Sequence, residues 1–305
     1  RVNAMEEYMK TIVHELIDSF IERGECDFIR EFTTPLPVYV IADQLGVPRE
    51  DLRDFKKWSD SFARRLSQMA TPEEQIEDAQ NIVAFQFYFA AMCVRRRKDP
   101  RDDMITDLVN TEIECPDTGE LRPLNMEELQ SLLQQLMVAG NETTTSAITG
   151  GMLSLIRDPR QMRDLQQHPE KIPNAVEEIL RMETPSSGLW RVVKKDSEIH
   201  GVEIPKDSLL MLRYHAANRD RELFEHPNDL DIGRTNADDH IAFGQGIHFC
   251  PGAMLARKEM NVAFNALLSR LDNIRLVEEK SDLGYWPNLV LRGLKAVHIA
   301  FDRRE

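Results

Sequence analysis

The sequence of 305 residues is poor in cysteine. It has four, Cys26, Cys93, Cys115 and Cys250, and their spacing contains no CxxC pair. This spacing excludes the disulfide framework of a small secreted protein. The first residues given do not have the pattern of a secretory signal peptide, so we expect none. Reduced thiols are the rule in the cytoplasm, so the sequence predicts a cytoplasmic location.

Long hydrophobic runs and an excess of basic charge are also missing. The most apolar stretch, residues 82–94, has 13 residues and includes Gln86, whereas a membrane-spanning helix needs about 20. We therefore expect no membrane span. The 38 basic side chains are outnumbered by 52 acidic ones, which gives a net charge of −14. Nucleic-acid binding requires a basic surface, so nucleic acid is excluded as the main partner.

Hydrophobic side chains at helical spacing dominate the first two-thirds of the chain. They predict helices over residues 5–21, 36–45, 50–66, 72–97 and 125–156. Asn125, with Glu128 three residues later, has the form of a capping box. The helix that it begins is longer than the ~10–14 residues usual in globular proteins, so we expect it to cross the centre of the molecule. Four aromatic side chains are expected in the core: Phe85, Phe87, Tyr88 and Phe89.

The last third of the chain has shorter elements. Residues 191–193, 197–200 and 209–212 are predicted strands, separated by glycine and proline. Residues 230–245 are mostly loop, and residues 252–271 form a predicted helix. There is no internal repeat and no obvious linker. This order indicates a fold that is mainly α with minor β (α+β), and a single domain over residues 1–305.

Cys250 lies in an unusual local sequence. It precedes a predicted helix, whose positive end favours a thiolate, and three glycines allow tight turns around it: Gly244, Gly246 and Gly252. Three kinds of site use such a cysteine. With His240 and His248 it could bind zinc, although a structural zinc site requires four ligands. It could be a nucleophile, which needs a base and an oxyanion site. It could be an axial ligand of haem iron, with backbone N–H groups aimed at the sulfur.

The whole segment resembles the haem-binding signature of the cytochrome P450 family. The matching positions are Phe243, Gly244, Gly246, His248, Cys250 and Gly252, followed by Leu255, Ala256 and Arg257. The resemblance implies the cytochrome P450 fold, in which a long central helix lies over the haem. It implies haem b (iron protoporphyrin IX) as the cofactor and Cys250 as the iron ligand. It also implies further cofactor contacts from Phe243, Gly244, Gly252 and His248, the last as a partner of a haem propionate.

Glu178 and Arg181 are similar to the ExxR pair of the family. On a helix these two side chains share one face and can form an ion pair. In the family the pair is joined by an arginine from the loop before the cysteine, and Arg234 stands at the matching position. The resemblance implies that all three have a structural role.

Residues 139–144 resemble the oxygen-activation segment of the family. Gly140 costs about 1 kcal/mol relative to alanine inside a helix, which makes sense where the helix approaches another group closely. The Thr143 hydroxyl can bond to the carbonyl of Ala139 and loosen the helix locally. The resemblance implies that Glu142 and Thr143 relay protons to iron-bound dioxygen, and that Ala139 and Gly140 contact the cofactor.

The remaining site residues are also implied by the resemblance. Arg191 corresponds to the strand arginine of the family that meets a haem propionate, and His248 is the second such partner. The walls of a pocket for a small apolar substrate are assigned to three segments, with the residues Met137, Val138, Ser187, Leu189, Leu289 and Val290.

The resemblance implies a monooxygenase that inserts one oxygen atom from O2 into a small apolar organic substrate. Because the sequence has no GxGxxG signature, the electrons are expected from a separate ferredoxin and its reductase. Arg257 and Lys258 are either docking cations for this acidic partner or ordinary solvated charges. Other readings keep the haem: a non-oxidative or peroxide-driven enzyme, or a non-catalytic haem-binding sensor. The resemblance does not include the N-terminal portion of the family, so we expect an N-terminal segment to be missing.

Overall fold

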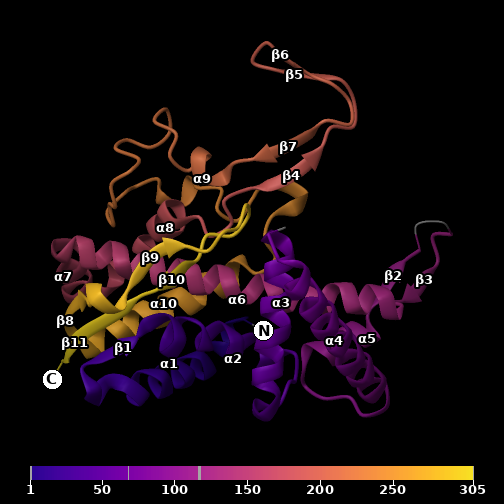
Figure 1. Ribbon diagram of the computed structural model, residues 1–305, viewed down its shortest axis with the longest axis horizontal. Coiled ribbons are helices and arrows are strands. Elements are labelled where there is room, and N and C mark those ends of the chain that lie inside the picture. Colours follow the sequence, from indigo (N-terminus) through magenta and orange to yellow (C-terminus); the bar gives the residue numbers. More distant parts are fainter. Residues whose placement is uncertain (1, 68, 116–117, 305) are drawn as a thin grey trace.

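A computed structural model describes residues 2–67, 69–115 and 118–304. Helices form most of it (Figure 1). Their bounds are α1 (Glu6–Phe20), α2 (Pro35–Gln44), α3 (Leu52–Ser67), α4 (Pro72–Lys98), α5 (Met104–Asn110), α6 (Met126–Arg157), α7 (Pro159–Gln167), α8 (Ile172–Glu183), α9 (Tyr214–Ala217) and α10 (Ala253–Arg270).

The strands are short, and all of their pairings are antiparallel. One sheet has three strands in the order β1-β11-β8, and the others pair β10 with β9, β2 with β3, β4 with β7, and β5 with β6. Their bounds are β1 (Glu25–Asp27), β2 (Glu112–Glu114), β3 (Leu121–Pro123), β4 (Leu189–Val192), β5 (Ser197–Ile199), β6 (Val202–Ile204), β7 (Leu209–Leu212), β8 (Leu271–Leu276), β9 (Asp282–Tyr285), β10 (Leu294–Ala296) and β11 (His298–Arg303).

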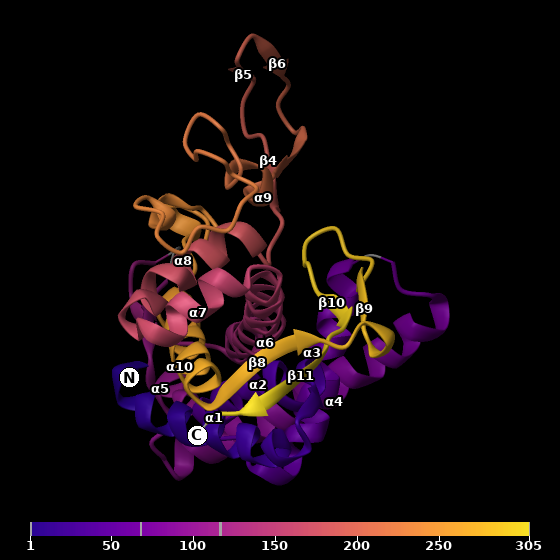
Figure 2. The ribbon, with the colours of Figure 1, turned by 90° about the vertical axis from the view of Figure 1, so that its left-hand side faces the viewer.

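The long helix α6 runs through the middle of the molecule, as predicted (Figure 2). Its start is fixed by the predicted capping box, because the Asn125 side chain accepts the Glu128 N–H at 2.9 Å and the Glu128 carboxylate accepts the Asn125 N–H at 2.9 Å. A similar box between Thr71 and Glu74 begins α4. These local bonds explain why both helix starts could be read from the sequence.

Two groups of buried hydrophobic side chains form the interior, and α6 contributes to both. Leu129 and Leu133, near its start, pack with side chains of α2, α3, α4 and α5. Ala147 and Met152, further along, pack with side chains of α1, α8, α10 and the β1-β11-β8 sheet. The same helix therefore joins the two cores.

Close packing against α6 occurs at Gly150 and Gly151 rather than at Gly140. A Cβ added at Gly151 would lie 2.6 Å from Cγ2 of Ile179, and one at Gly150 would lie 2.3 Å from a carboxylate oxygen of Glu183. These two glycines let α8 cross α6. At Gly140 the nearest atoms belong to Ile41 at 3.8 Å, an ordinary contact, so the described residues do not explain that glycine by close approach.

The sequence-based helices lie where expected, with ends that differ by a few residues. The prediction for the aromatic group is wrong in one member: Phe85 and Phe89 are buried, whereas Phe87 is 75% exposed. Phe87 falls on the face of α4 that points away from α3. Helix α7 was not predicted, because its sequence is largely polar and it buries few apolar side chains, among them Met162 and Leu165. A π-helical turn at Ile29–Thr33 was also not predicted.

Among the described residues, no helix combines the length and the apolar character that a bilayer crossing demands.

Candidate active site

Cys250 ends a tightly folded loop that leads into α10. Gly244 and Gly246 have φ angles of +71° and +68°, which glycine adopts without strain. The Cys250 N–H donates to the carbonyl of Phe243 at 2.9 Å and closes the loop. The thiol is half-buried, three residues before the first residue of α10. The glycines thus fix the direction in which the sulfur projects.

The surroundings of the sulfur argue against two of the three readings of Cys250. Burial raises the pKa of its thiol, while the N–H groups of Gly252 and Ala253 and the charge of Arg257 lower it. A reactive nucleophile needs a clearly lowered pKa. Within residues 2–67, 69–115 and 118–304, no group of three His, Cys, Asp or Glu side chains could hold a metal ion, so the described residues offer no zinc site.

The third reading, a haem ligand, fits the local surface. The side chains next to Cys250 in the loop are apolar and open to solvent: Ile247 is 97% exposed and Phe249 is 49% exposed. A large planar apolar group at the sulfur would cover such side chains, and the N–H groups that face the sulfur stabilise negative charge on it. One cysteine side chain such as Cys250 would be enough to hold a haem iron.

Carboxylates already engage the two candidate docking cations. Arg257 donates to Glu177 at 2.7 and 2.8 Å and lies over the ring of Phe243 at 4.6 Å. Burial raises the pKa of Glu177, but hydrogen bonds from His240 and Arg257 outweigh this effect and lower the pKa to about 2. Lys258 pairs with Glu6 of α1 at 2.6 Å. Neither cation is therefore an unengaged surface charge.

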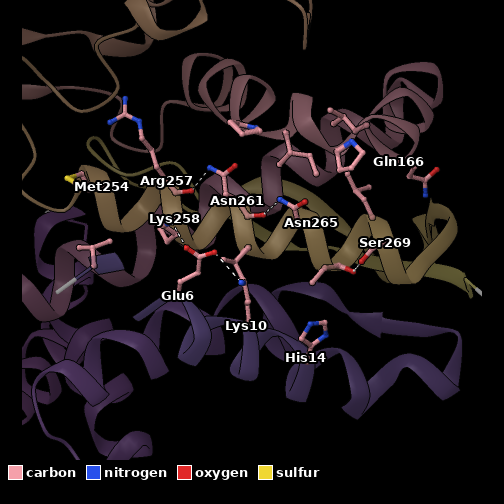
Figure 3. A pocket seen from close by; sticks show the side chains of 18 of the residues that line it. Glu6, Lys10, His14, Gln166, Met254, Arg257, Lys258, Asn261, Asn265 and Ser269 are labelled. Atoms are coloured by element: carbon pink, nitrogen blue, oxygen red, sulfur yellow. Dashed lines mark hydrogen bonds and ion pairs between the residues drawn. The ribbon is translucent and has the colours of Figure 1, made fainter. Parts of the chain in front are cut away.

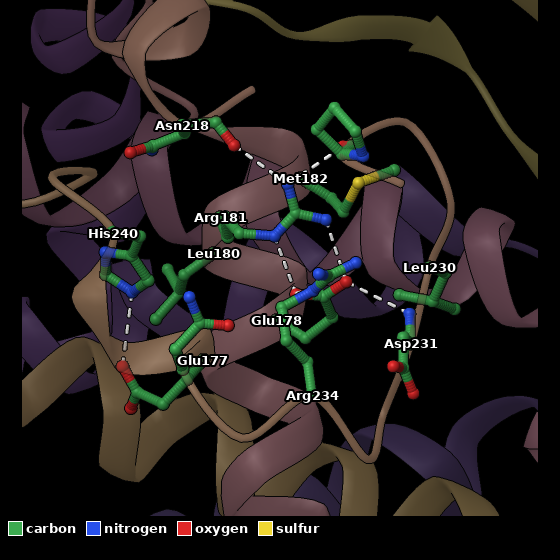
Figure 4. A network of polar contacts seen from close by, with 12 residues as sticks. Glu177, Glu178, Leu180, Arg181, Met182, Asn218, Leu230, Asp231, Arg234 and His240 are labelled. Atoms are coloured by element: carbon green, nitrogen blue, oxygen red, sulfur yellow. Dashed lines mark hydrogen bonds and ion pairs between the residues drawn. The ribbon is translucent and has the colours of Figure 1, made fainter. Parts of the chain in front are cut away.

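The three residues Glu178, Arg181 and Arg234 meet in one buried cluster (Figure 4). The Arg181 guanidinium donates to both carboxylate oxygens of Glu178, at 2.7 and 2.8 Å. Nε of Arg234 donates to the same carboxylate at 3.0 Å. The Asp231 N–H adds a further bond at 3.0 Å. One buried carboxylate thus holds two cations.

The cluster also fixes the chain that leads to the cysteine loop. Arg181 donates to the carbonyls of Asn218 and Pro227 at 2.8 and 2.9 Å, and Arg234 donates to that of Glu225 at 2.7 Å. The Asn218 side chain in turn accepts the N–H of Ile241 at 2.8 Å. These bonds connect α8 to segment 218–241, which is mostly irregular.

Glu142 and Thr143 lie half-buried in the middle of α6. The Thr143 hydroxyl donates to the carbonyl of Ala139 at 2.7 Å, as the spacing predicts. The Glu142 carboxylate is 3.3 Å from Nζ of Lys56 on α3, and Lys56 also pairs with Asp60. The predicted acid is therefore held in an ion pair by a neighbouring helix.

Lys56 and Asp60 were not identified from the sequence. Burial raises the pKa of Asp60, and Lys56 lowers it. For Lys56, burial lowers the pKa, and the two carboxylates outweigh it in the opposite direction. The i, i+4 spacing of Lys56 and Asp60 indicates a pair on one helix face, but no local signal places that pair against Glu142, 82 residues further on in the chain.

The structure places the predicted pocket residues in different environments. Ser187 is buried and links two segments, since its hydroxyl donates to the carbonyls of Leu289 and Val290 at 2.9 and 3.0 Å. Leu189 and Leu289 are 40% and 55% exposed. Met137 is different: it has no exposed surface and packs in the core beside Leu133. Met137 therefore packs in the core around α6, and its contact with a substrate stays a prediction.

Four further residues that are predicted to contact the substrate or the cofactor are partly or fully exposed to solvent. Val138 is half-buried and Ala139 exposed on α6, and His248 is exposed in a 3₁₀ turn over Gly246–His248. Arg191 of β4 is half-buried, and its side chain donates to the carbonyl of Trp190 at 2.9 Å. Both Arg191 and His248 therefore keep exposed surface that an anionic group can contact.

A groove of about 1070 Å³ lies between α1, α7 and α10 (Figure 3). Its polar lining includes Lys10, His14 and Asn261. Neither Cys250 nor Thr143 lines it, so this groove is separate from the candidate site.

Glu259 of α10 is a second residue that the sequence did not single out. Its carboxyl is completely buried next to Thr144 of α6; burial raises its pKa to about 8, against a lowering by the Thr144 hydrogen bond. The folded protein therefore keeps this proton up to about pH 8, while the unfolded chain releases it near pH 4.5.

This difference predicts a pH dependence of stability. Between pH 4.5 and 8 the unfolded state binds fewer protons, so the Glu259 contribution to the free energy of unfolding falls by about 1.4 kcal/mol per pH unit as the pH rises. Glu259→Gln keeps the shape of the side chain and removes its titratable group. Urea unfolding at several pH values should show a flatter profile for the variant, and an unchanged slope would contradict the buried neutral carboxyl.

Comparisons with known proteins agree with this geometry. The family model described as Cytochrome P450 matches residues 54–291. A steroid C26-monooxygenase of Mycobacterium tuberculosis (strain CDC 1551 / Oshkosh) is 36% identical over 301 residues, which cover 99% of this chain and 79% of the relative. The putative cytochrome P450 YjiB of Bacillus subtilis is 37% identical over 303 residues, which cover 96% of this chain and 72% of the relative.

Solved structures show the same likeness. P450BioI, crystallised with an acyl carrier protein ligated to hexadec-9Z-enoic acid, superposes with a TM-score of 0.91 and 32% identity, over 99% of this chain and 75% of that one. CYP109E1 of Bacillus megaterium, crystallised with testosterone, superposes with a TM-score of 0.87 and 32% identity, over 98% of this chain and 79% of that one. The family match and the relatives together show that this chain belongs to the cytochrome P450 family of oxidoreductases, whose cofactor is haem iron.

Proposed function

We propose that this chain forms the haem-thiolate site of a monooxygenase that inserts one oxygen atom from O2 into a small apolar organic molecule. The observation that carries the proposal is the half-buried Cys250 thiol, which has no partner metal ligand among the described residues and receives N–H groups from the start of α10. When bound, haem b supplies the activation of dioxygen, and the thiolate ligand favours O–O cleavage.

The residues proposed to contact the cofactor come from the cysteine loop, from β4 and from α6. Cys250 is the iron ligand, and Phe243, Gly244 and Gly252 shape the loop that presents it. Arg191 and His248 are the proposed partners of the propionates, because a cation or ring N–H stabilises a carboxylate. Ala139 and Gly140 offer a face of α6 without large side chains. Glu178, Arg181 and Arg234 act through the fold and touch no substrate.

Proton delivery is assigned to Glu142 and Thr143. Thr143 has a hydroxyl that can donate and accept, and Glu142 is next to it on the same helix. The ion pair of Glu142 with Lys56 directs the carboxylate towards α3. A change of partner from Lys56 to water would let the carboxylate accept a proton from that water and pass it on to the Thr143 hydroxyl.

The substrate and the electron donor are proposed more broadly. Val138, Leu189 and Leu289 provide apolar walls, and the names of related proteins refer to a steroid and to testosterone. A sterol-like or long-chain apolar compound is therefore the first choice for screening. A separate ferredoxin and reductase are the proposed electron donors. The four cysteines are free thiols, which fits the cytoplasm. Because α6 joins both cores, residues 1–305 are proposed to form one domain.

Replacement of Thr143 by alanine tests the proton relay. With a surrogate ferredoxin system, NADPH and O2, product formation per NADPH should fall by roughly 10²-fold, the size of a general acid–base contribution. With hydrogen peroxide as the oxygen source it should change little, because peroxide already carries the protons. Testosterone can serve as the first probe substrate, followed by a panel of fatty acids.

Two variants on the same helix separate the relay from general damage. Thr143→Ser keeps a hydroxyl and should restore most of the activity, while Ser146→Ala, a half-buried hydroxyl one turn away, should have little effect. Equal losses with O2 and with peroxide would count against the relay. Activity with peroxide alone, already in the unsubstituted protein, would favour the peroxide-driven alternative.

A further inference from the structure

Helix α4 has an apolar face that no described residue covers. Four large side chains on it are exposed: Ile76 by 63%, Val83 by 48%, Phe87 by 75% and Val94 by 47%. Their spacing of seven, four and seven residues puts them on one side of a helix. In both ribbon views α4 lies at the periphery of the molecule (Figures 1 and 2). Isolated apolar side chains on a surface are ordinary, but a continuous stripe marks an interaction site.

The stripe is symmetric about a midpoint at position 85. Reading outwards from this midpoint, Val83 corresponds to Phe87, Gln80 to Ala90, Ala79 to Ala91 and Ile76 to Val94. The next pair outwards on this face is Glu73 and Arg97, both exposed. Each large apolar residue thus corresponds to another large apolar residue. Each alanine corresponds to an alanine or to a glutamine, and the acidic residue corresponds to a basic one.

We propose that α4 is a self-association surface, on which two copies of this chain pair their α4 helices antiparallel around a two-fold axis. Such an axis places each residue opposite the one at the corresponding distance from the midpoint. Phe87 of each copy then packs against Val83 of the other, and Ile76 packs against Val94. Glu73 at one end meets Arg97 at the other, so two ion pairs frame the apolar contact.

The charges on α4 favour a second copy over a membrane surface. The helix begins with acidic residues, including Glu73 and Glu74, and ends with Arg95, Arg96, Arg97 and Lys98. Helices that lie on membranes have basic side chains along their whole polar face, and this chain has a net charge of −14. Opposite charges at the two ends match an antiparallel partner of the same sequence.

The size of the surface sets the expected strength. A helix of 27 residues is about 40 Å long, and one helix pair provides an area near the lower limit of the ~1,200–2,000 Å² of stable interfaces. The dimer should therefore be concentration-dependent. In sedimentation velocity of the haem-loaded protein, the mass should rise from that of the 35.2 kDa chain towards twice this value between ~1 and ~100 µM.

Phe87→Asp should weaken the association by about tenfold or more, since it puts a charge at the centre of the apolar contact. The matched control is Ile199→Asp, which changes an apolar side chain of β5 that is 54% exposed and lies outside the stripe. It should leave the association unchanged. A protein that stays monomeric over the whole range, or that associates equally well with Phe87→Asp, would overturn the proposal.

A charge exchange tests the antiparallel arrangement itself. Glu73→Arg alone and Arg97→Glu alone each place like charges together and should weaken the dimer, whereas the double exchange should restore it. Arg97 also donates to the carbonyl of Leu124 at 3.3 Å, so the rescue, rather than the single loss, is the decisive result. Failure of the rescue would overturn this geometry. Phe87-dependent flotation of a monomeric protein with phosphatidylcholine–phosphatidylglycerol vesicles would overturn it in favour of a membrane.

Discussion

Replacement of Cys250 by serine is expected to abolish the absorbance band that carbon monoxide produces with reduced, thiolate-ligated haem. A serine hydroxyl is a far weaker donor to iron, so the electron density that a thiolate supplies is lost. Turnover with O2 should fall below detection. The glycine-shaped loop has no other cysteine, so no neighbouring thiol can take over. The measurement is a difference spectrum of the purified, haem-reconstituted protein with and without carbon monoxide.

Cys115→Ser is the matched control for this variant. Cys115 is also half-buried, but it lies beside β2, far along the chain from α10. This variant should keep the full band. If Cys250→Ser kept the band as well, or if the unsubstituted protein bound haem and never showed it, the assignment of the iron ligand would be wrong.

Glu178→Gln should have the largest effect on stability. The amide carries no charge, so the buried guanidinium groups of Arg181 and Arg234 lose their only carboxylate partner among the described residues. Breaking a buried ion pair by removal of one partner costs about 3–5 kcal/mol. We expect a loss of this size in urea unfolding, or a chain that no longer folds. The cysteine loop should lose order with it, because Asn218 connects the cluster to Ile241.

Glu128→Gln provides a matched comparison on the surface. Glu128 also binds an arginine through both oxygens, with Arg122 at 2.8 and 2.8 Å, but both side chains are about one-third exposed. Water replaces what the variant loses, and glutamine still completes the capping box with Asn125. A much smaller loss than for Glu178→Gln is expected. Equal losses would mean that burial does not explain the importance of the cluster.

The sequence predicts those parts of the molecule that depend on neighbours in the chain. The start of α6 follows from its capping box, and the turns before Cys250 follow from glycines at fixed positions. The family resemblance also pointed to the meeting of Glu178, Arg181 and Arg234, which the structure brings together. These signals are local or belong to a long motif, so a single sequence is enough to recognise them.

The remaining features depend on contacts between distant segments. Lys56 reaches Glu142 only because α3 packs on α6, and Glu259 loses its solvent only because α10 packs on α6. Helical spacing alone did not distinguish the inner face of α4, with Phe85 and Phe89, from the outer face with Phe87. Met137 was assigned to a pocket wall by the family resemblance, and helical spacing alone did not show that its side chain packs in the core.

The three-stranded sheet determines when the fold can be completed during synthesis. Cys26 in β1 pairs with Ile299 in β11, 299 − 26 = 273 residues further along the chain, so β1 has to wait for this later segment to leave the ribosome. At about 5–20 residues per second this delay is roughly a quarter of a minute to a minute. Contacts between residues that lie so far apart in the sequence slow folding. During the delay, Phe20 and the apolar face of α1 lack part of their covering, and exposed apolar surface of this kind favours aggregation.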